Sequence, residues 1–346
     1  MNRRLPAEWA PQAAVLLTWP RADGDFADAL SEVVDNFTRL TLTIARFEPV
    51  WISTADDPAA LRCRLLDAGV PESRLRLWQV PNDDVWTRDH GPVTVFENGA
   101  PLHLDFRFNG WGGKFPHARD DALTARLAQL GALPFPLRRV DFVLEGGAIE
   151  TDGAGTLLSM QRCLFHHSRN PGLDRSRIAS VLREQLGCTR LLWLTRGDLL
   201  GDDTDGHIDT LARFCDPATI AYQACDDRDD PHFAELAAMR RELEALRRAD
   251  GAPYALIPLP LPRSLHDAGG RRLPAGYANF LILNGAVLLP TYTDPADAVA
   301  AERLRPAFPG REIVGVDCRA LIRQSGSLHC VSMQIPSSQA VIAADG

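Results

Sequence analysis

The 346-residue sequence contains no run of about 20 apolar residues, the length that a helix needs to cross a membrane. Its short apolar run Ala13–Trp19 ends at Pro20 and precedes no small-residue cleavage pattern, unlike a signal peptide. No long Lys/Arg run interrupts the formal net charge of −8, which argues against nucleic-acid binding. We therefore expect a cytoplasmic protein that engages neither a membrane nor a nucleic acid.

The cysteines form neither a disulfide framework nor a zinc motif. Their number, seven, is odd, and no CxxC pair is present. The pair His166-His167 lacks a carboxylate or cysteine at zinc-ligand spacing, and the motifs HExxH and GxSxG are absent. Either all the thiols are buried in a protein of a reducing compartment, or one of them is a nucleophile.

Apolar stripes of helical period alternate with short apolar or β-branched runs, which predicts an α/β fold. Helices are expected over residues 30–44, 123–130, 178–186, 233–246 and 295–306. Strands are expected over residues 75–80, 93–96, 140–144, 157–160, 191–194, 211–214, 219–222 and 313–316. Asp120 or Asp121 is the expected N-cap of the second helix. No linker stands out, so a single domain over residues 1–346 is expected, although the length alone would allow two.

Two local patterns refine this prediction. Hairpins with type I′ turns are expected at Asp152-Gly153 and Asn284-Gly285. Unusual polar clusters also recur, separated by 45 to 77 residues, at Trp19-Pro20, Trp86–Asp89, Glu145–Gly147, His207–Asp209, Asn284-Gly285 and His329-Cys330. This spacing indicates one functional loop in each supersecondary unit, as a cryptic repeat would produce; chance is the alternative.

The strongest polar cluster surrounds His207. Asp209 lies two residues further on, so on an extended segment both side chains would face one pocket. A calcium-binding turn is the competing interpretation, because oxygen ligands are available on Asp202, Asp203 and Asp205. The EF-hand spacing is absent, however, and an apolar strand follows directly, which favours a loop anchored at the edge of the core.

Other candidate residues are a thiol, tryptophans and carboxylates in short loops. Cys330 leaves a glycine-bearing loop, a position that favours partial exposure of its thiol. Trp86 stands close to Asp89, and an aromatic wall beside a carboxylate binds a planar cation; a surface turn with a local Arg–Asp pair is the alternative. Glu145 ends an expected strand, and Trp111 lies in a glycine-rich loop without phosphate-binding spacing.

These residue types together indicate the charge of the substrate. Carboxylates near a thiol raise its pKa and suppress the thiolate. A cysteine nucleophile surrounded by Asp and Glu is therefore effective only when the substrate brings positive charge. A guanidinium does so, and two carboxylates can bind its N–H edges in bidentate fashion.

Six segments, in chain order, match a known family: Pro6–Pro11, Trp86–Pro92, Phe108–Lys114, Glu145–Gly147, Asp203–Asp209 and Gly326–Cys330. On these segments the chain resembles the agmatine deiminase family, which is related to bacterial peptidylarginine deiminase within the guanidine-modifying (pentein) superfamily. The resemblance spans essentially the whole chain. Many members read Gly-Gly-Asn-Ile-His-Cys before the nucleophile, whereas this chain reads Ser-Gly-Ser-Leu-His-Cys over residues 325–330.

The resemblance implies a five-bladed α/β propeller with pseudo-fivefold symmetry and an active site in its central channel. It implies that Cys330 is the nucleophile and His207 the general acid/base. Asp89 and Asp209 are implied to bind the guanidinium, and Glu145 to orient His207 or complete the guanidinium site.

Further expectations follow from the same resemblance. Asp203 is implied as another substrate-binding residue, and Trp86 and Trp111 are expected to wall the substrate site. The implied reaction is hydrolysis of agmatine, a small cationic guanidine, to N-carbamoylputrescine and ammonia through an amidino-cysteine on Cys330, a step of polyamine (putrescine) biosynthesis. No metal or organic cofactor is implied, and the oligomeric state stays open, a homodimer included.

Three alternatives stand beside this hypothesis. In the first, the substrate is free arginine or a peptidyl arginine; a site for agmatine should hold no arginine reserved for a substrate carboxylate. In the second, Cys330 and His207 belong to a cysteine peptidase, which would need an oxyanion hole and would leave the carboxylates unused. In the third, the chain is an inactive guanidine-binding module, which disagrees with the presence of every expected catalytic residue.

Overall fold

The computed structural model describes residues 3–340, so both ends of the domain predicted over residues 1–346 lie outside the described residues. The described strands form five sheets that share one plan. In each sheet the first two strands pair antiparallel. A third strand, which follows a helix, then pairs with the second strand in parallel. Among these residues, no helix has both the length and the apolar content needed to cross a bilayer.

Four sheets use consecutive segments of the chain. Their strands are β5 (Val93–Glu97), β6 (Ala100–Arg107) and β7 (Leu137–Val143); β8 (Ile149–Thr151), β9 (Thr156–Met160) and β10 (Arg190–Leu194); β11 (Ala212–Asp216), β12 (Thr219–Gln223) and β13 (Ala255–Leu259); and β14 (Leu281–Ile282), β15 (Ala286–Thr291) and β16 (Glu312–Asp317). The short β1 (Arg3–Arg4) adds an antiparallel edge to β5.

The fifth sheet joins the two ends of the chain. Its strand order is β17 (Ser332–Pro336), β2 (Gln12–Thr18), β3 (Val50–Thr54) and β4 (Leu75–Gln79). Strand β17 runs antiparallel to β2, whereas β2, β3 and β4 are parallel. The strand that follows Cys330 is therefore fixed to the N-terminal part of the chain.

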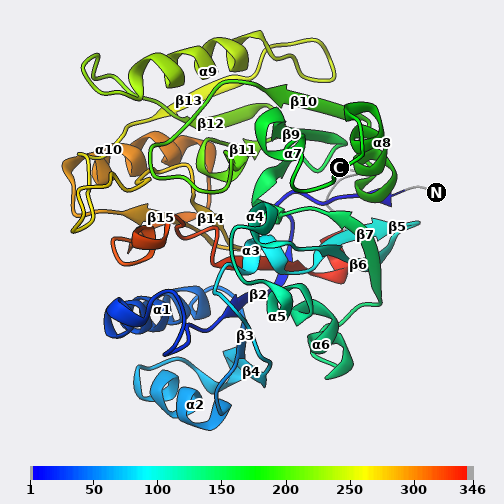
Figure 1. The fold of residues 1–346 in the computed structure, drawn as a ribbon, viewed down its shortest axis with the longest axis vertical. Helices are drawn as coiled ribbons and strands as arrows, with labels where there is room; N and C mark the ends of the chain where they lie inside the picture. The colour runs from blue at the N-terminus through cyan, green and yellow to red at the C-terminus, as the bar shows by residue number, and fades with distance from the viewer. Residues whose placement is uncertain (1–2, 341–346) are drawn as a thin grey trace.

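The long helices lie at the outside of the molecule in Figure 1, and the short α3 (Thr87–His90) and α4 (Gly110–Gly113) lie near its middle. The outer helices are α1 (Leu30–Ala45), α2 (Pro58–Asp67), α6 (Leu123–Gln129), α8 (Arg175–Leu186), α9 (Phe233–Ala245) and α10 (Pro295–Leu304). Two more single-turn helices are α5 (Ala118–Asp121) and α7 (Gln161–Leu164).

The five predicted helices are confirmed, and their ends have local causes. Helix α8 begins where the Asp174 carboxylate accepts the N–H of Arg177 and ends at Gly187, whose φ of 71° suits a residue without Cβ. The predicted N-cap of α6 is wrong. Its N-cap residue is Ala122, because the Asp120 carboxylate is already bound to the backbone of a neighbouring loop.

Both predicted hairpins are confirmed, but the predicted type I′ turns are wrong. That turn requires a positive φ at both central residues, and neither Asp152 nor Asn284 has one. The first connection is longer than predicted, since Thr151 pairs with Leu157. In the second, the Asn284 side chain accepts from and donates to the backbone of Gln12, so tertiary contacts hold the turn.

The sequence patterns missed several elements, notably β2, β3 and α2. Strands β2 and β3 are buried almost throughout, so they lack the alternation of apolar and polar residues that marks a half-exposed strand. Helix α2 buries only Leu61 and Leu65, which leaves a weak helical stripe.

The polar loops occupy equivalent places in the five sheets. Helix α3 precedes β5, the short 3₁₀ helices Gly146–Ala148 and Ile208–Thr210 precede β8 and β11, and Asn279 and Cys330 precede β14 and β17. Hydrogen bonds link these loops; for example, the Arg88 N–H donates to the Cys330 carbonyl. For the fourth sheet the predicted loop is wrong: Asn284-Gly285 is a hairpin turn, and the equivalent place is held by Asn279, which was not predicted.

Candidate active site

The residues predicted for the site come together at one pocket. Glu145, His207 and Asp209 are buried behind its wall. The other predicted residues line the pocket itself: Trp86, Asp89, Trp111, Asp203 and Cys330. Four of these residues come from loops that precede three of the sheets, and Trp111 comes from α4, between β6 and β7, so the site depends on the mutual arrangement of those sheets.

The Cys330 thiol faces two polar groups. Its Sγ lies 3.4 Å from Asn279 Oδ1, to which it donates, and 3.8 Å from Asp209 Oδ2. The residue is 5 % exposed, less than the partial exposure expected from its loop. Burial, followed by the charges of Asp209 and Asp89, raises the pKa of the Cys330 thiol well above its ordinary value. The free site therefore keeps the thiol protonated.

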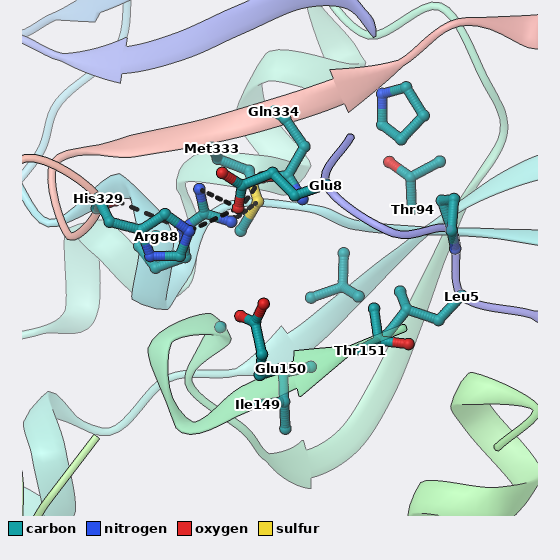
Figure 2. Close-up of a pocket in the computed structure, with 14 residues that line it drawn as sticks. Leu5, Glu8, Arg88, Thr94, Ile149, Glu150, Thr151, His329, Met333 and Gln334 are labelled. Carbon is teal, nitrogen blue, oxygen red and sulfur yellow. Dashed lines mark hydrogen bonds and ion pairs between the residues drawn. The ribbon is translucent and has the colours of Figure 1, made fainter. Parts of the chain in front are cut away.

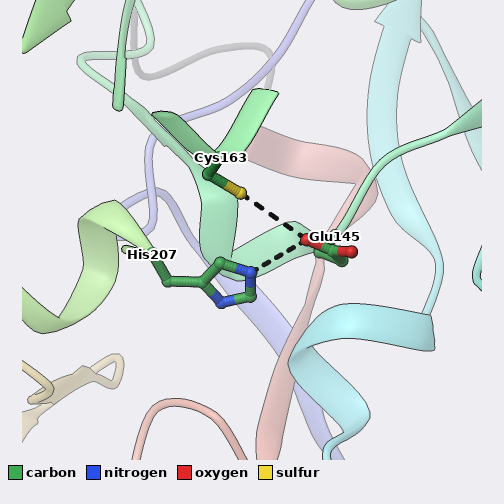
Figure 3. A group of neighbouring side chains, drawn as sticks. All are labelled: Glu145, Cys163 and His207. Carbon is green, nitrogen blue, oxygen red and sulfur yellow. Dashed lines mark hydrogen bonds and ion pairs between the residues drawn. The ribbon is translucent and has the colours of Figure 1, made fainter. Parts of the chain in front are cut away.

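His207 lies between two carboxylates. Its Nε2 is 3.0 Å from Glu145 Oε2, as Figure 3 shows, and its Nδ1 is 3.6 Å from Asp89 Oδ1. Burial alone would lower the pKa of His207, but Asp89, Cys163 and Glu145 together raise it well above the ordinary value. His207 is therefore an imidazolium with a proton to give, and its Nδ1 has no hydrogen-bond partner among the described residues.

Asp89 is a fixed acceptor at the inner end of the pocket. Its Oδ2 accepts the indole N–H of Trp111 at 2.9 Å, and its Oδ1 accepts the N–H of Gly147 at 3.0 Å. Burial raises the pKa of Asp89 to about 6, although the nearby His207 opposes that shift. A cation that enters the pocket would favour the ionised form.

Asp209 presents one bound and one unbound carboxylate oxygen. Its Oδ2 is 2.7 Å from His329 Nδ1, whereas its buried Oδ1 has no partner among the described residues. Burial would raise the pKa of Asp209, but the hydrogen bond with His329 lowers it below the ordinary value. The expected extended segment is wrong here, because residues 208–210 form a 3₁₀ turn. His207 and Asp209 nevertheless both approach Gly147.

Glu145 connects His207 to a cysteine that the sequence patterns did not single out. The Cys163 Sγ lies 3.7 Å from Glu145 Oε2 (Figure 3), and Arg169 Nε lies within 2.9 Å of both carboxylate oxygens. Burial would raise the pKa of Glu145, but His207 and Arg169 lower it below its ordinary value. The buried Cys163 carries no sequence motif of its own, which is why only the structure reveals it.

Three of these side chains have the chemistry of metal ligands. The donor atoms of Glu145, Cys163 and His207 lie within 4.8 Å of one another. Arg169, however, donates to both oxygens of Glu145 and also binds Asp205, so a fixed positive charge stands beside the cluster. This charge opposes a bound cation, and the cluster is better suited to hold the imidazolium of His207.

The glycine at position 147, in the segment Glu145–Gly147, leaves room for the side chains of His207 and Asp89. A Cβ atom at Gly147 would lie 2.5 Å from His207 Nδ1 and 2.9 Å from Asp89 Oδ1. Neither group can retreat freely, since the first is held by Glu145 and the second by Trp111. Position 147 therefore requires glycine, because any Cβ there would clash with two side chains of the site.

Gly147→Ala is expected to lower kcat/KM by about a hundredfold or more while the protein remains folded, because it displaces His207 and Asp89 from their reacting geometry. The measurement is steady-state ammonia release together with a thermal unfolding curve. Gly131→Ala is the control: its added Cβ meets open space at a φ of 67°, so it should cost about 1 kcal/mol of stability and leave activity intact. Equal kinetics for the two variants would contradict the steric argument.

The outer part of the pocket is acidic and aromatic. Asp25, Asp84 and Asp203 line it together with Trp86 and Phe115. Burial raises the pKa of Asp84 to about 7 and that of Asp203 to about 6. Sequence patterns indicated only Asp203 and Trp86; Asp25 comes from a distant loop, and nothing local in the sequence assigned it to the site.

The alternative of a local Arg88–Asp89 ion pair on a surface turn is wrong. Arg88 is 4 % exposed, and its guanidinium donates to groups of the segment that contains β17. Its Nη1 donates to Gln334 Oε1 at 2.5 Å, and its Nη2 lies 3.8 Å from Glu8 Oε2. Arg88 therefore ties α3 to β17 and to the N-terminal segment, and leaves Asp89 free to face the pocket.

Comparison with known proteins gives the family. The sequence profile of Porphyromonas-type peptidyl-arginine deiminase matches residues 4–336. Agmatine deiminase of Stutzerimonas stutzeri is 34% identical over 96% of this chain and 95% of its own length. A cysteine-to-serine variant of C. jejuni agmatine deiminase with substrate bound has a TM-score of 0.90 at 35% identity, covering 97% of this chain and 96% of that chain.

A further solved structure, from Porphyromonas gingivalis and provisionally described as an arginine deiminase, has a TM-score of 0.91 at 50% identity. It covers 97% of this chain and 99% of that chain. The resemblance seen in the sequence is thus confirmed, and the fold is the mixed α/β fold of these structures. The chain belongs to the Porphyromonas-type peptidyl-arginine deiminase family, with agmatine deiminases among its relatives.

Proposed function

We propose that the protein hydrolyses agmatine to N-carbamoylputrescine and ammonia through a covalent amidino-cysteine on Cys330. One observation carries the proposal: a buried thiol adjoins the carboxylates of Asp89 and Asp209 and lies in the same site as the imidazolium of His207. Such a set of charges serves a cationic substrate and disfavours a neutral one. A peptidase would instead need oxyanion donors and no surplus carboxylates.

In this mechanism the guanidinium binds between Asp89 and Asp209 and donates to the free Oδ1 of Asp209. Its positive charge lowers the pKa of Cys330, whose proton passes to solvent. The thiolate forms a bond to the guanidinium carbon. His207 gives its proton to an amino group of that carbon, the C–N bond breaks, and ammonia leaves.

The second half returns the enzyme to its starting state. Neutral His207 accepts a proton from water, and the water oxygen bonds to the amidino carbon. The bond between that carbon and Cys330 Sγ then breaks, and the proton of the new C–OH group passes to the sulfur, which releases the ureido product and restores the thiol. Glu145 orients His207 throughout through the contact at Nε2, and Arg169 holds Glu145 in place.

The acidic outer pocket supports agmatine among guanidines. Agmatine carries a primary ammonium at the far end of its chain, and Asp25, Asp84 and Asp203 would face it. Within the described part of the chain, no arginine or lysine lines this pocket, so the carboxylate of free arginine would meet carboxylates there. A free arginine substrate is the second candidate, because the P. gingivalis structure at 50% identity is provisionally described as an arginine deiminase.

Ammonia release from agmatine, free arginine and a peptidyl arginine, measured side by side, tests this proposal. Agmatine is expected to have the highest kcat/KM, by about tenfold or more, which corresponds to one like-charge contact of modest strength. A higher kcat/KM for arginine or for the peptide would show that the proposed substrate is wrong and that the proposed reaction, deimination, is right. No turnover of any guanidine would contradict deimination itself.

The KM for agmatine is expected to rise as the pH falls through 7 and then 6. The pKa values of Asp84 and Asp203 in the free protein are about 7 and about 6, so both carboxylates become neutral across this range and attract the ammonium less. Asp203→Asn should raise KM at pH 8 and reduce the pH dependence near 6, part of which remains because the pKa of Asp89 is also about 6. A KM that is flat from pH 8 to 5.5 would exclude these carboxylates from substrate binding.

Several sequence-based expectations also belong to the proposal. The five sheets are proposed as the blades of a five-bladed α/β propeller, supported by their shared strand plan and by equivalent loops that meet at the site. One catalytic domain is proposed for residues 1–346. The cytoplasmic location, the independence of nucleic acid and the homodimer stay predictions.

A further inference from the structure

Behind Asp209, on the side away from the substrate pocket, stands the buried ring of His329. Its Nδ1 is 2.7 Å from Asp209 Oδ2, and its Nε2 is 2.7 Å from Glu8 Oε2. His329 is 1 % exposed. It lines a second pocket with Glu8 and Arg88, shown in Figure 2, and is absent from the described lining of the substrate pocket.

The geometry fixes the protonation of this ring. Burial would raise the pKa of Glu8, but Arg213 and His329 lower it far below the ordinary value, and His329 lowers that of Asp209 as well. Both partners are therefore carboxylates, which only accept hydrogen bonds. Both nitrogens of His329 must donate, so the ring is an imidazolium held between two anions.

Glu8 is itself firmly anchored. Its Oε2 accepts from Arg213 Nη2 at 2.8 Å, and its Oε1 accepts the N–H of Ile282 at 2.7 Å. Arg213 in turn donates to Glu150 Oε2 at 2.7 Å and to the Phe280 carbonyl. The N-terminal segment thus supplies a rigid counter-ion to a histidine that lies 321 positions later in the chain.

We propose that His329 is a positioning residue: an imidazolium, fixed by Glu8, that holds Oδ2 of Asp209 and thereby directs the free Oδ1 at the substrate. The proposal deepens the proposed function, on which its kinetic readout rests. It also gives the N-terminal segment a part in the site. His329 acts only through Asp209, since its ring nitrogens are both occupied by carboxylates.

Kinetics across pH test the role of the charge. In His329→Gln the cation is lost, and the pKa of buried Asp209 should rise, because a neighbouring opposite charge favours the carboxylate. Asp209 would then be neutral at low pH, so KM should rise about tenfold or more near pH 6 and recover as the pH increases. Glu8→Gln should shift the profile in the same direction but less, because the His329–Asp209 hydrogen bond can survive. The other titratable or charged groups around Asp209, namely Cys330, His207, Asp89, Arg88 and Arg213, are unchanged in both variants.

The matched control is His103→Gln, another fully buried histidine, whose ring pairs with Thr94 and lies outside the site. It should lower the melting temperature without moving the pH profile of KM. A merely structural role for His329 predicts the same for His329→Gln: lower stability with an unshifted profile. That result would overturn the proposal.

A second measurement needs no variant of His329 and no activity. Histidine side-chain ¹⁵N NMR of the whole protein at pH 8 is expected to show two rings with both nitrogens protonated, His207 and His329. His207→Gln should remove one and leave the other. If no imidazolium remains in His207→Gln, the positioning proposal fails even though agmatine turnover stands; if the signals are present but wild type releases no ammonia from agmatine, the proposed function fails instead.

Discussion

Replacing Cys330 by alanine is expected to abolish ammonia release, with kcat reduced by at least about a thousandfold, the scale seen when a covalent nucleophile is removed. The reason is that no other described thiol lines the substrate pocket. The remaining carboxylates would still bind the cation, so substrate affinity should change little. Binding of agmatine to Cys330→Ala, followed by calorimetry, separates loss of chemistry from loss of binding.

Cys215→Ala is the matched control for this experiment. Its thiol is also buried, at 3 % exposure, but it lies in β11 and outside the pocket. It is expected to lose some stability through the vacated volume and to retain turnover near that of wild type. Turnover of Cys330→Ala within tenfold of wild type would remove Cys330 from the role of nucleophile.

Asp89→Asn is expected to lower kcat/KM by about a thousandfold or more. Both oxygens of Asp89 accept hydrogen bonds, from Trp111 and from Gly147, so an amide would turn its NH₂ group against one of these donors. The substitution also removes a negative charge from the guanidinium and from His207, whose pKa should fall. Substrate binding and the proton donor would thus be weakened together.

The measurement is kcat/KM for agmatine from pH 6 to 9, with circular dichroism to verify the fold. Asp141→Asn serves as the control, because its side chain is 91% exposed and its carboxylate pairs with Arg107 at the surface. It should match wild type within a factor of two, since exposed ion pairs contribute about 0–1 kcal/mol. Normal binding and turnover by Asp89→Asn would show that Asp89 does not hold the guanidinium.

The sequence predicted the loops of the candidate site better than it predicted the strands and turns of the fold. Short motifs such as Glu145–Gly147 and His207–Asp209 identified the loops, because their residue types suit only a few chemistries and because each loop precedes the first strand of a sheet. Asn279 was missed at the equivalent place in the fourth sheet. A single asparagine in an apolar stretch resembles an ordinary buried polar residue, and only the structure shows its Oδ1 at 3.4 Å from Cys330 Sγ.

Sequence motifs did not predict the residues that hold the site residues in place. Glu8 meets His329 across 321 positions, and Arg213 meets Glu8 across 205. The first pair arises from the pairing of β17 with β2, and the second joins the N-terminal segment to β11; no local pattern encodes either contact. The buried strands β2 and β3 were missed for a related physical reason: complete burial removes the alternation that marks a strand.

The most direct test of the central claim is mass spectrometry of the protein quenched with acid during turnover of agmatine. We expect the peptide that contains Cys330 to gain the mass of agmatine less one ammonia, and the gain to be absent from Cys330→Ala. His207→Gln, which lacks the residue proposed to activate water, should accumulate less adduct if expulsion of ammonia is slowed and more if hydrolysis is slowed. Wild-type protein that releases ammonia with no adduct on Cys330, or with the adduct on another residue, would contradict the account.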